Sequence, residues 1–359
     1  MRIGFDLRSV DLTSGGGISN YGRNLLENLI KIDKQNEYFL FNNQFSPHTE
    51  KFQDLKIKSY KYPNKAFNFS QKFLAYPKID QLLGGVDLFF SPNILFTAVS
   101  NKCKHVVCAH DISFKLFPEF LSSKRKVWHY FVNPQKMYAQ ADKIIAVSEN
   151  TKNDLINNMN ISPDKIKVIY SGINIHNPAS EELDQIKEKY ILPDKFILTL
   201  SVLEPRKNIS SLITAFQELN LFGYKLIIAG RRGWKDNQIL KQIKNNPNIL
   251  FLENISDKEK FSLYKLASLF VFPSFYEGFG FPPLEAMSQG SPIVASLNSS
   301  ISEICGEQAI LIDPYNIYEL KQGIKEGLKK EKNNFNIEEK FNWERTARET
   351  LSLFSEILR

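Results

Sequence analysis

The stretch FPSFYEGFGFPPLEAMSQGSPIVAS, residues 272–296, decides the fold of this chain. The apolar run Leu269–Phe272 predicts a strand that leads into it. The Pro282-Pro283 pair predicts the start of a helix, since proline is favoured where the backbone N–H has no partner. We therefore expect Glu277 on the loop between strand and helix, and Glu285 in the first turn of the helix.

Four residues between the two acids bear on ligand binding: Gly278, Phe279, Gly280 and Phe281. The glycines let the backbone lie close to a ligand and leave amide N–H groups available at a helix N-terminus, where negative or hydroxyl-rich groups bind. One carboxylate could then bind hydroxyls at one end of such a ligand, and the other carboxylate at its other end. For a bare pair of acids, an ordinary turn with solvent-facing glutamates is the more frequent explanation.

The full wording SFYEGFGFPPLEAM is far more specific than a pair of acids. It resembles the signature loop of the retaining glycosyltransferases of the GT-B fold, which include bacterial mannosyl-, glucosyl- and N-acetylglucosaminyltransferases of surface polysaccharide assembly. The resemblance implies that Glu277 holds the hydroxyls of a donor sugar, helped by the amides of residues 279–281. It also implies that Glu285 binds the ribose of the nucleotide.

Short apolar runs alternate with helical patterns along all 359 residues, which predicts parallel sheets covered on both faces. The runs form two sets. We expect an α/β protein of GT-B type, with two doubly wound Rossmann-like domains facing each other across a cleft. The resemblance implies that the first, residues 1–175, binds the acceptor and that the second, residues 176–342, binds the nucleotide-sugar donor. The resemblance implies that a C-terminal helix, residues 343–359, packs back on the first domain.

Composition excludes several classes of protein. A hydrophobic fraction of 43% and a charged fraction of 24% are ordinary for a soluble globular protein. Charged residues near the start argue against a signal peptide, no apolar run approaches the ~18–20 residues of a spanning helix, and three cysteines suit a reducing compartment. We expect a cytoplasmic protein. Cys103 and Cys108 near His105 and His110 are only a thin hint of a metal site, because both cysteines fall on a strand-like run.

Positive charge is concentrated in the first half of the chain. Residues 1–180 hold 23 Lys and Arg against 15 Asp and Glu, whereas residues 181–359 hold 23 against 24. Residues 51–78 contain seven lysines interleaved with aromatic residues and no acid from Leu55 to Lys78. This pattern suits an anionic membrane surface, which would put the protein on the inner face of the cytoplasmic membrane. A solvated loop with inward aromatics is an equal alternative, and no nucleic-acid module is found.

A glycine loop, Ser14–Gly17, follows the first predicted strand and precedes a helix, which suggests a backbone cradle for phosphate. It is not GxGxxG, because Asn20 stands where the last glycine would be. The second strand also ends without the acid that holds a dinucleotide ribose, so a dehydrogenase is the weaker interpretation. The loop resembles the family's GGI-x-x-Y pattern, which implies that Gly16 and Gly17 close over the donor diphosphate.

Two cations, Arg206 and Lys207, stand directly before a predicted helix that Asn208 would cap. Cations at a helix N-terminus are unfavourable unless an anion lies between them and the amides, and a diphosphate would resolve that conflict. Arginine can fork two oxygens and lysine adds a point charge. The string LEPRKN resembles the family's diphosphate-binding element; without the glutamate loop, such a pair would usually be solvated.

Two further positions resemble the family. His110, in a His-Asp pair at the end of a predicted strand, resembles the histidine beside the donor sugar, although most lone histidines at strand ends are simply satisfied there. Arg232 follows another strand, in a loop that resembles the one near the nucleotide base. A solvent-facing arginine is as good an explanation for Arg232.

The resemblance covers residues 3–355 and is strongest to polysaccharide and lipopolysaccharide mannosyltransferases. It implies transfer of a hexose, with GDP-mannose as favoured donor, to a saccharide acceptor that is lipid-linked, with retention of configuration. No metal or other cofactor is expected, because side-chain cations can neutralise the diphosphate. A UDP-sugar-dependent glucosyl- or N-acetylglucosaminyltransferase, a nucleotide-sugar epimerase and a binding module without catalysis stay open as alternatives.

Overall fold

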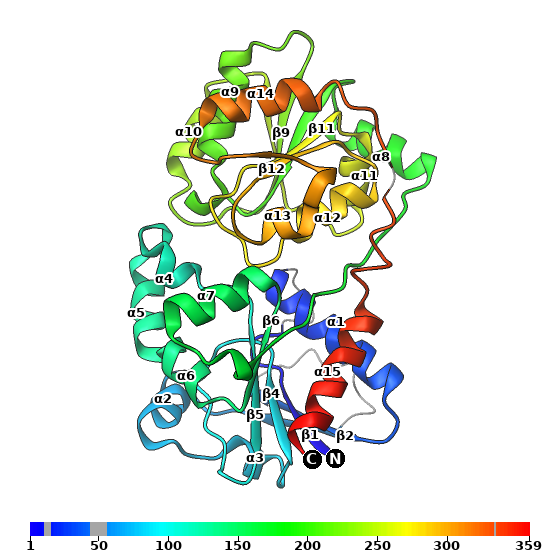
Figure 1. The fold of residues 1–359 in the computed structure, drawn as a ribbon. Helices are drawn as coiled ribbons and strands as arrows, with labels where there is room; N and C mark the ends of the chain where they lie inside the picture. Colours follow the sequence, from blue (N-terminus) through cyan, green and yellow to red (C-terminus); the bar gives the residue numbers. More distant parts are fainter. Residues whose placement is uncertain (11–15, 44–55, 334) are drawn as a thin grey trace. The chain divides into compact units, whose positions relative to one another are not determined.

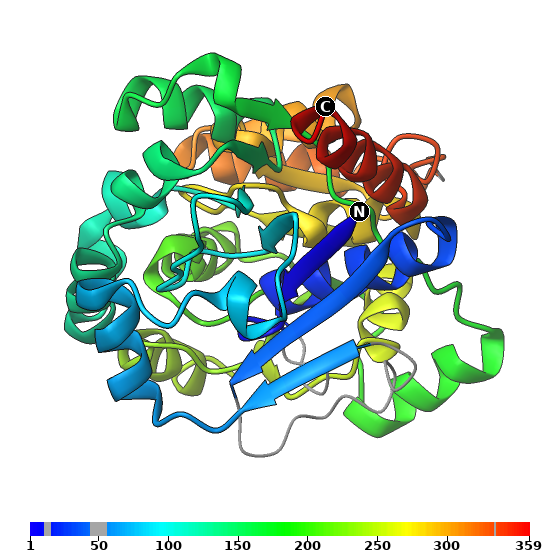
Figure 2. The same ribbon diagram turned by 90° about the horizontal axis from the view of Figure 1, so that it is seen from below.

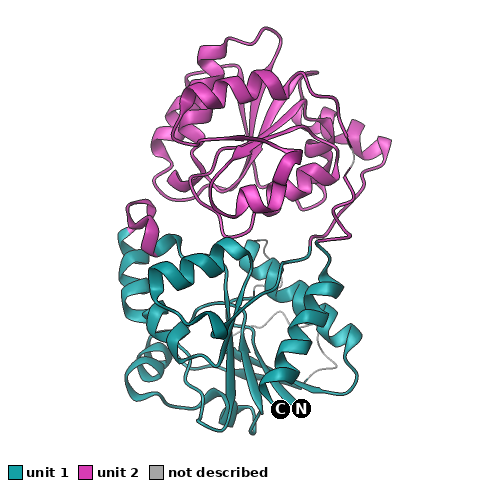
Figure 3. Ribbon diagram, viewed as in Figure 1, with its two compact units in different colours: residues 1–114, 123–172, 341–359 teal, residues 115–122, 173–340 magenta. Residues whose placement is uncertain are grey.

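The structure is a computed structural model that describes residues 1–10, 16–43, 56–333 and 335–359. The chain divides into two compact units (Figure 3): unit 1 is Met1–Phe114, Ser123–Gly172 and Phe341–Arg359, and unit 2 is Lys115–Ser122 and Ile173–Lys340. The expected first domain ran to residue 175 without interruption. In the structure, residues 115–122 instead belong to unit 2.

Within the described residues, unit 1 is built on a parallel sheet of seven strands in the order β3-β2-β1-β4-β5-β6-β7. The strands are β1 (Arg2–Asp6), β2 (Glu37–Asn43), β3 (Lys56–Tyr60), β4 (Leu88–Ser91), β5 (Lys104–Ala109), β6 (Lys143–Ala146) and β7 (Ile166–Val168). The helices and helical turns are α1 (Gly17–Ile32), α2 (Asn64–Phe69), η2 (Ser70–Leu74), α3 (Ile79–Leu82), α5 (Ser123–Val132), α6 (Pro134–Gln140), α7 (Glu149–Met159), η4 (Pro163–Lys165) and α15 (Trp343–Ile357). The short helix α4 (Ser113–Leu116) begins in unit 1 and ends in unit 2. Helices lie on both sides of this sheet (Figure 1), which is why most residues of its inner strands β4 and β6 are apolar and buried.

The C-terminal helix α15 completes unit 1. It packs along α1, and its inward side chains, Trp343 and Phe354 among them, are buried. The Phe354 ring lies 5.5 Å from that of Phe90 in β4. Seen from below in Figure 2, α15 and the N-terminal strand lie close together. The last residues of the chain therefore share a core with the first.

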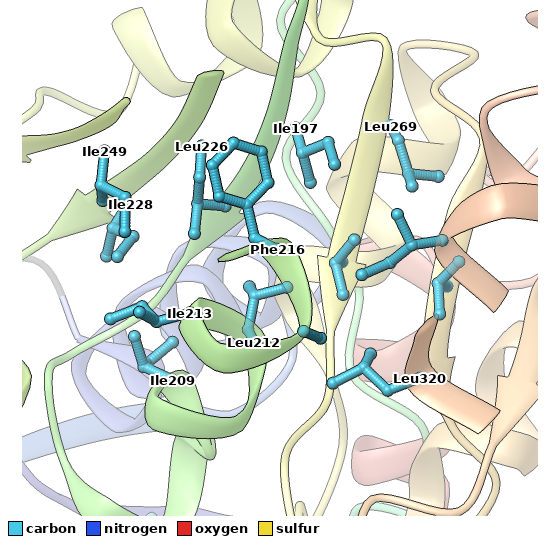
Figure 4. Packing of buried hydrophobic residues seen from close by; sticks show 14 of the residues in the cluster. Ile197, Ile209, Leu212, Ile213, Phe216, Leu226, Ile228, Ile249, Leu269 and Leu320 are labelled. Carbon is cyan, nitrogen blue, oxygen red and sulfur yellow. The ribbon is translucent and has the colours of Figure 1, made fainter. Parts of the chain in front are cut away.

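Unit 2 has the same plan, with six parallel strands in the order β10-β9-β8-β11-β12-β13 among the described residues. The strands are β8 (Phe196–Leu200), β9 (Lys225–Gly230), β10 (Ile249–Glu253), β11 (Leu269–Phe272), β12 (Ile293–Ser296) and β13 (Ile310–Ile312). The helices and helical turns are η3 (Pro118–Phe120), α8 (Ser180–Tyr190), η5 (Pro205–Lys207), α9 (Ile209–Leu219), α10 (Asn237–Lys244), α11 (Glu259–Leu266), α12 (Phe281–Ser288), α13 (Ser299–Cys305), η6 (Gly306–Gln308) and α14 (Ile317–Gly327). Leu212 and Phe216 of α9 and Leu320 of α14 pack on the strand residues Leu226 and Leu269 to form the core of this unit (Figure 4).

Both strand orders confirm the predicted doubly wound α/β architecture. In each unit the order reverses at one point, between β1 and β4 in unit 1 and between β8 and β11 in unit 2. Ligands of such sheets bind outside the carboxyl ends of the strands at this reversal. In unit 2 a ligand is therefore expected at the loops that follow β8 and β11. Among the described helices, none has the length and apolar character needed to cross a membrane.

Candidate active site

The loop after β8 carries the two predicted cations on a single helical turn. Arg206 and Lys207 belong to η5, and Asn208, with φ 55°, joins η5 to α9. Asparagine tolerates this left-handed conformation better than most residues. The side chain of Asn208 does not cap α9 as expected; it donates to the carbonyl of Pro314 at 2.8 Å. Asn208 therefore ties η5 to the loop after β13.

Glu277, on the loop after β11, meets both cations. One oxygen, Oε2, accepts from Nη1 of Arg206 at 2.7 Å, and the other, Oε1, lies 2.5 Å from Nζ of Lys207. The side chains are 10%, 18% and 12% exposed for Glu277, Arg206 and Lys207. Three residues predicted from two separate motifs thus form one buried charge cluster at the reversal point of the sheet.

A fourth charge in this cluster, Glu204, was not among the predicted site residues. Its carboxylate accepts from Nε of Arg206 at 3.0 Å, and its side chain is 5% exposed. Arg206 also donates to the carbonyl of Tyr276 at 2.7 Å. The guanidinium is therefore fixed from two sides, and two carboxylates balance two cations.

Burial and charge act in opposite directions in this cluster. Burial alone would raise the pKa of the Glu277 carboxyl, but Arg206 and Lys207 outweigh it and lower that pKa to about 2. Burial lowers the pKa of Lys207, the Arg206 charge lowers it further, and the two carboxylates only partly oppose the shift. One more anion beside Lys207 would therefore stabilise its charged ammonium form.

The Glu277 loop is held by α13. Ser299 accepts from the backbone N–H of Glu277 at 3.1 Å, and the Ser300 hydroxyl lies within hydrogen-bond distance of two loop carbonyls, those of Glu277 (2.9 Å) and Phe279 (2.7 Å). On the preceding residues, the ring of Tyr276 lies 5.5 Å from that of Phe117 in the 115–122 segment. The carboxylate is therefore fixed by its backbone as well as by its ion pairs.

The loop between Glu277 and α12, residues 278–280, is buried. Gly280 has φ 120°, a conformation that favours glycine, and it directly precedes α12. An added Cβ there would lie 2.7 Å from Cδ1 of Ile301. Gly278 and Phe279 are buried beside it, and the ring of Phe281 lies 5.0 Å from that of Phe279. A side chain at position 280 would therefore require Ile301 to shift and would have to adopt a φ that favours glycine.

Glu285 lies in a second polar cluster, with residues of α11. Its oxygens accept from Nζ of Lys260 at 2.7 Å and from the hydroxyl of Tyr264 at 3.1 Å. Burial raises the pKa of Glu285, and Lys260 only partly offsets that effect. The expected place in the first turn is wrong, because α12 begins at Phe281 and puts Glu285 at its fifth position.

His110, Gly16 and Gly17 belong to unit 1. Nε2 of His110 lies 2.8 Å from the carbonyl oxygen of Pro92, and burial lowers the pKa of the ring, which is therefore neutral at pH 7. Because a carbonyl only accepts, Nε2 carries the hydrogen and Nδ1 is an acceptor. Gly16 and Gly17 form the exposed start of α1, which has no acidic residue in its first turn. Ser14 and Gly15 lie outside the described residues.

Arg232 follows β9 and is 52% exposed, with Nε 2.9 Å from Oδ2 of Asp236. Its backbone forms an isolated bridge with Leu203, the residue before Glu204. Gly230, the last residue of β9 before this loop, has φ 143°, and an added Cβ would lie 1.9 Å from the carbonyl oxygen of Ser201. The loop therefore lies directly against the chain that leads to the charge cluster. Among the residues that the structure describes, no group of three or more His, Cys, Asp and Glu could hold a metal ion.

Comparison with known families decides what kind of protein carries this site. A family model described as glycosyl transferases group 1 matches residues 181–349, and one described as glycosyltransferase family 4 matches residues 15–177. Between them they take in nearly the whole chain. The chain belongs to these glycosyltransferases.

Bacterial relatives of this glycosyltransferase include several mannosyltransferases. The O-antigen chain mannosyltransferase B of Escherichia coli is 29% identical over 74% of this chain and 72% of its own length. The O-antigen chain mannosyltransferase RfbU of Salmonella typhimurium is 28% identical over 58% of this chain and 56% of its own length. The serotype-specific mannosyltransferase WbdA of E. coli is 28% identical over 71% of this chain, but the matched part is only 34% of WbdA.

Solved structures share the fold of this glycosyltransferase. Sucrose-phosphate synthase of Thermosynechococcus elongatus matches with a TM-score of 0.77 at 18% identity, over 99% of this chain and 98% of that one. Anabaena HepE, solved in complex with UDP-glucose, matches with a TM-score of 0.73 at 18% identity, over 99% of this chain and 100% of that one. These likenesses confirm the GT-B fold class.

Sequence reasoning missed three residues that contact the predicted site of this glycosyltransferase: Glu204, Lys260 and Tyr264. Glu204 lies within the LEPRKN string and could have been found, since an acid beside two cations is a natural partner for them. Lys260 and Tyr264 carry no motif. Their approach to Glu285 depends on the packing of α11 against α12, which no local pattern encodes.

Proposed function

We propose that this glycosyltransferase moves a hexose from a nucleoside diphosphate sugar to a saccharide acceptor with retention of anomeric configuration. GDP-mannose is the favoured donor, because the bacterial relatives described above are mannosyltransferases. The favoured acceptor is a lipid-linked saccharide of surface polysaccharide or lipopolysaccharide synthesis, since two of those relatives are named for O-antigen chains. The proposal includes a cytoplasmic location, with which three buried free cysteines agree.

One observation carries this proposal: the buried cluster of Glu204, Arg206, Lys207 and Glu277 at the reversal point of the unit 2 sheet. Burial and Arg206 lower the pKa of Lys207, so another anion would stabilise its charged form. A diphosphate would supply that anion, with Arg206 forking two oxygens and Lys207 acting as a point charge.

Donor binding would also change the role of Glu277. Phosphate oxygens would replace its carboxylate on the two cations, and the carboxylate oxygens could then accept hydrogen bonds from sugar hydroxyls. As the bond to the sugar breaks, negative charge grows on the diphosphate. Arg206, held in place by Glu204, and Lys207 would stabilise that charge without reorganisation. The family resemblance favours attack from the face of the leaving group.

The other predicted residues take supporting roles in the proposal. Glu285 would accept ribose hydroxyls, since each carboxylate oxygen has about two acceptor sites, and Lys260 and Tyr264 each occupy only one. His110 would accept from a hydroxyl of the donor sugar through Nδ1. The further groups proposed to face the donor are the amides of Gly16, Gly17, Gly278, Phe279, Gly280 and Phe281, and the side chain of Arg232. The proposal requires no metal or other cofactor.

The test is a labelled-donor assay with GDP-mannose, UDP-glucose and UDP-N-acetylglucosamine. Transfer or hydrolysis of GDP-mannose supports the proposal, and NMR of the product gives its anomeric configuration. Turnover of a UDP-sugar alone would replace the donor assignment. Binding that raises the melting temperature without turnover would indicate a binding module, and an isomerised sugar an epimerase.

Variants connect that activity to the cluster. Lys207→Met and Glu277→Gln should each lower turnover about 100-fold or more, as expected when a preorganised electrostatic group is lost. Lys241→Met on α10, an exposed lysine of the same unit, is the matched control and should keep full activity. Near-normal turnover in both cluster variants would overturn the site assignment.

A further inference from the structure

Large apolar side chains are exposed on two stretches of unit 1, residues 69–76 and α5. Phe69, Leu74 and Tyr76 are 60%, 66% and 65% exposed in the first stretch, and Tyr130 is 80% exposed in the second. The others in these stretches are Phe73, Val127 and Phe131. Figures 1 and 2 both draw the two stretches on the same side of unit 1. Single exposed apolar residues are common, but a group of this kind marks an interaction surface.

The exposed rings of the first stretch are held outward by buried contacts on the inner side. Gln71 of η2 is buried, donates to the carbonyl of Pro77 at 2.7 Å and accepts from the N–H of Ala98 at 2.8 Å. Phe67 is buried under the guanidinium of Arg8, whose Cζ lies 5.5 Å from the ring centroid. The segment is therefore fixed in place, and its exposed rings are presented on a formed surface.

The alternative of inward-facing aromatics describes only part of residues 51–78. Tyr60, Tyr62 and Phe67 form a stack with 5.5 Å between successive ring centroids, and Phe67 is buried. Tyr62 is 39% exposed, and the more strongly exposed rings begin at Phe69. Residues 51–55, including Phe52, lie outside the described residues. The second stretch, α5, was not predicted at all.

In the sequence, cations are interspersed with the exposed side chains or follow them closely, and acids are absent from both stretches. There is no Asp or Glu from residue 55 to 79 or from residue 120 to 141. The cations are Lys61, Lys65, Lys72 and Lys78 around the first stretch, and Lys124, Arg125, Lys126 and Lys136 on and after the second. A second copy of the chain would be repelled by this charge, so a homodimer contact does not suit it.

We propose that residues 61–78 and α5 together form a surface that binds an anionic lipid membrane. Lysine and arginine bind anionic headgroups, and Phe, Tyr and Leu enter the boundary between headgroups and acyl chains. Single-stranded nucleic acid also uses cations with aromatics, but the aliphatic Leu74 and Val127 suit acyl chains better than bases. The surface would hold the enzyme where a lipid-linked acceptor is found. The membrane-binding proposal does not depend on the proposed glycosyl transfer, because vesicle binding is measured without donor or acceptor.

The experiment is co-sedimentation with two kinds of vesicle. One is phosphatidylcholine with about 30% phosphatidylglycerol, which mimics an anionic surface, and the other is pure phosphatidylcholine. We expect binding to the anionic vesicles that weakens with added salt. The triple variant Lys124→Gln, Arg125→Gln, Lys126→Gln should lose about 100-fold in partitioning, since each cation contributes roughly a five-fold gain. The double variant Phe69→Ser, Phe73→Ser should also lose binding while keeping the wild-type melting temperature.

The matched control removes three exposed lysines from unit 2, with Lys241→Gln, Lys244→Gln and Lys258→Gln. It should bind vesicles almost as wild type does. No binding to anionic vesicles at low salt would overturn the proposal, as would an equal loss in the control. Preference for a single-stranded oligonucleotide over the vesicles would overturn it in favour of nucleic acid.

Discussion

Glu277 and Glu285 are both buried carboxylates of one loop-helix element, yet their surroundings shift their pKa values in opposite directions. Burial raises both. Glu277 faces the charges of Arg206 and Lys207, which lower its pKa to about 2, whereas Glu285 has Lys260 and a tyrosine hydroxyl, and its pKa stays raised. The number of neighbouring cations therefore decides the result.

This difference predicts opposite effects of acid on stability. The pKa of Glu277 is depressed from an ordinary 4.5 to about 2, so its contribution is complete above pH 4.5 and is lost as the pH falls toward 2. The contribution amounts to about 3 kcal/mol. Urea unfolding at pH 6 and pH 3 should show a larger loss of stability in the wild type than in Glu277→Gln, which has no carboxyl to titrate.

Glu285→Gln is the comparison variant. Because the pKa of Glu285 is raised, its ionisation costs stability as the pH rises above 4.5. The stability of wild type relative to Glu285→Gln should therefore decrease from pH 3 to pH 6, the reverse of the Glu277 result. The same sign for both variants would mean that the two environments are not as described.

Secondary structure elements were the most predictable part of this molecule. Parallel strands buried on both faces read as continuous apolar runs, so Leu269–Phe272 was recognised from its residues alone. Local reasoning failed where a side chain had a distant partner. Asn208 has the right chemistry for a cap, but Pro314, more than a hundred residues away, offers the carbonyl that it binds.

The end of β9 depends on one glycine, Gly230. Gly230→Ala should cost about 3 kcal/mol, because a Cβ would lie 1.9 Å from the Ser201 carbonyl oxygen at a φ of 143°. Gly223→Ala is the control, since Gly223 has φ 77° but nothing within 4 Å, and strain alone should cost about 1 kcal/mol. Thermal unfolding measures both, and equal losses would rule out a steric role for Gly230.

Assembly of the elements into units was predictable only in outline. Two sets of strands indicated two domains, but periodicity does not say which chain segments share a core. Residues 115–122 pack with unit 2 through Phe117 and Phe120, whose rings lie 5.5 Å and 5.4 Å from those of Tyr276 and Phe275. These contacts are long-range aromatic pairs, and nothing in the local sequence specifies the partner.

The division into units predicts where core substitutions act. Phe354→Ala in α15 and Phe216→Ala in α9 each remove a buried ring and should each cost about 3–5 kcal/mol. Hydrogen exchange by mass spectrometry should show faster exchange in the strands of unit 1 for Phe354→Ala, and in those of unit 2 for Phe216→Ala. Equal acceleration in both units for either variant would contradict two separate cores.

The place of α15 has a consequence during synthesis on the ribosome. The helix that closes the core around β1 is translated after every residue of unit 2. Until α15 is made, Phe90 of unit 1 lacks its contact with Phe354, so the core of unit 1 is incomplete. Unit 2 does not contain α15 and can complete its core without it. We expect a released chain truncated after residue 342 to expose unit 1 to proteases and chaperones, whereas unit 2, whose residues are all present, resists them.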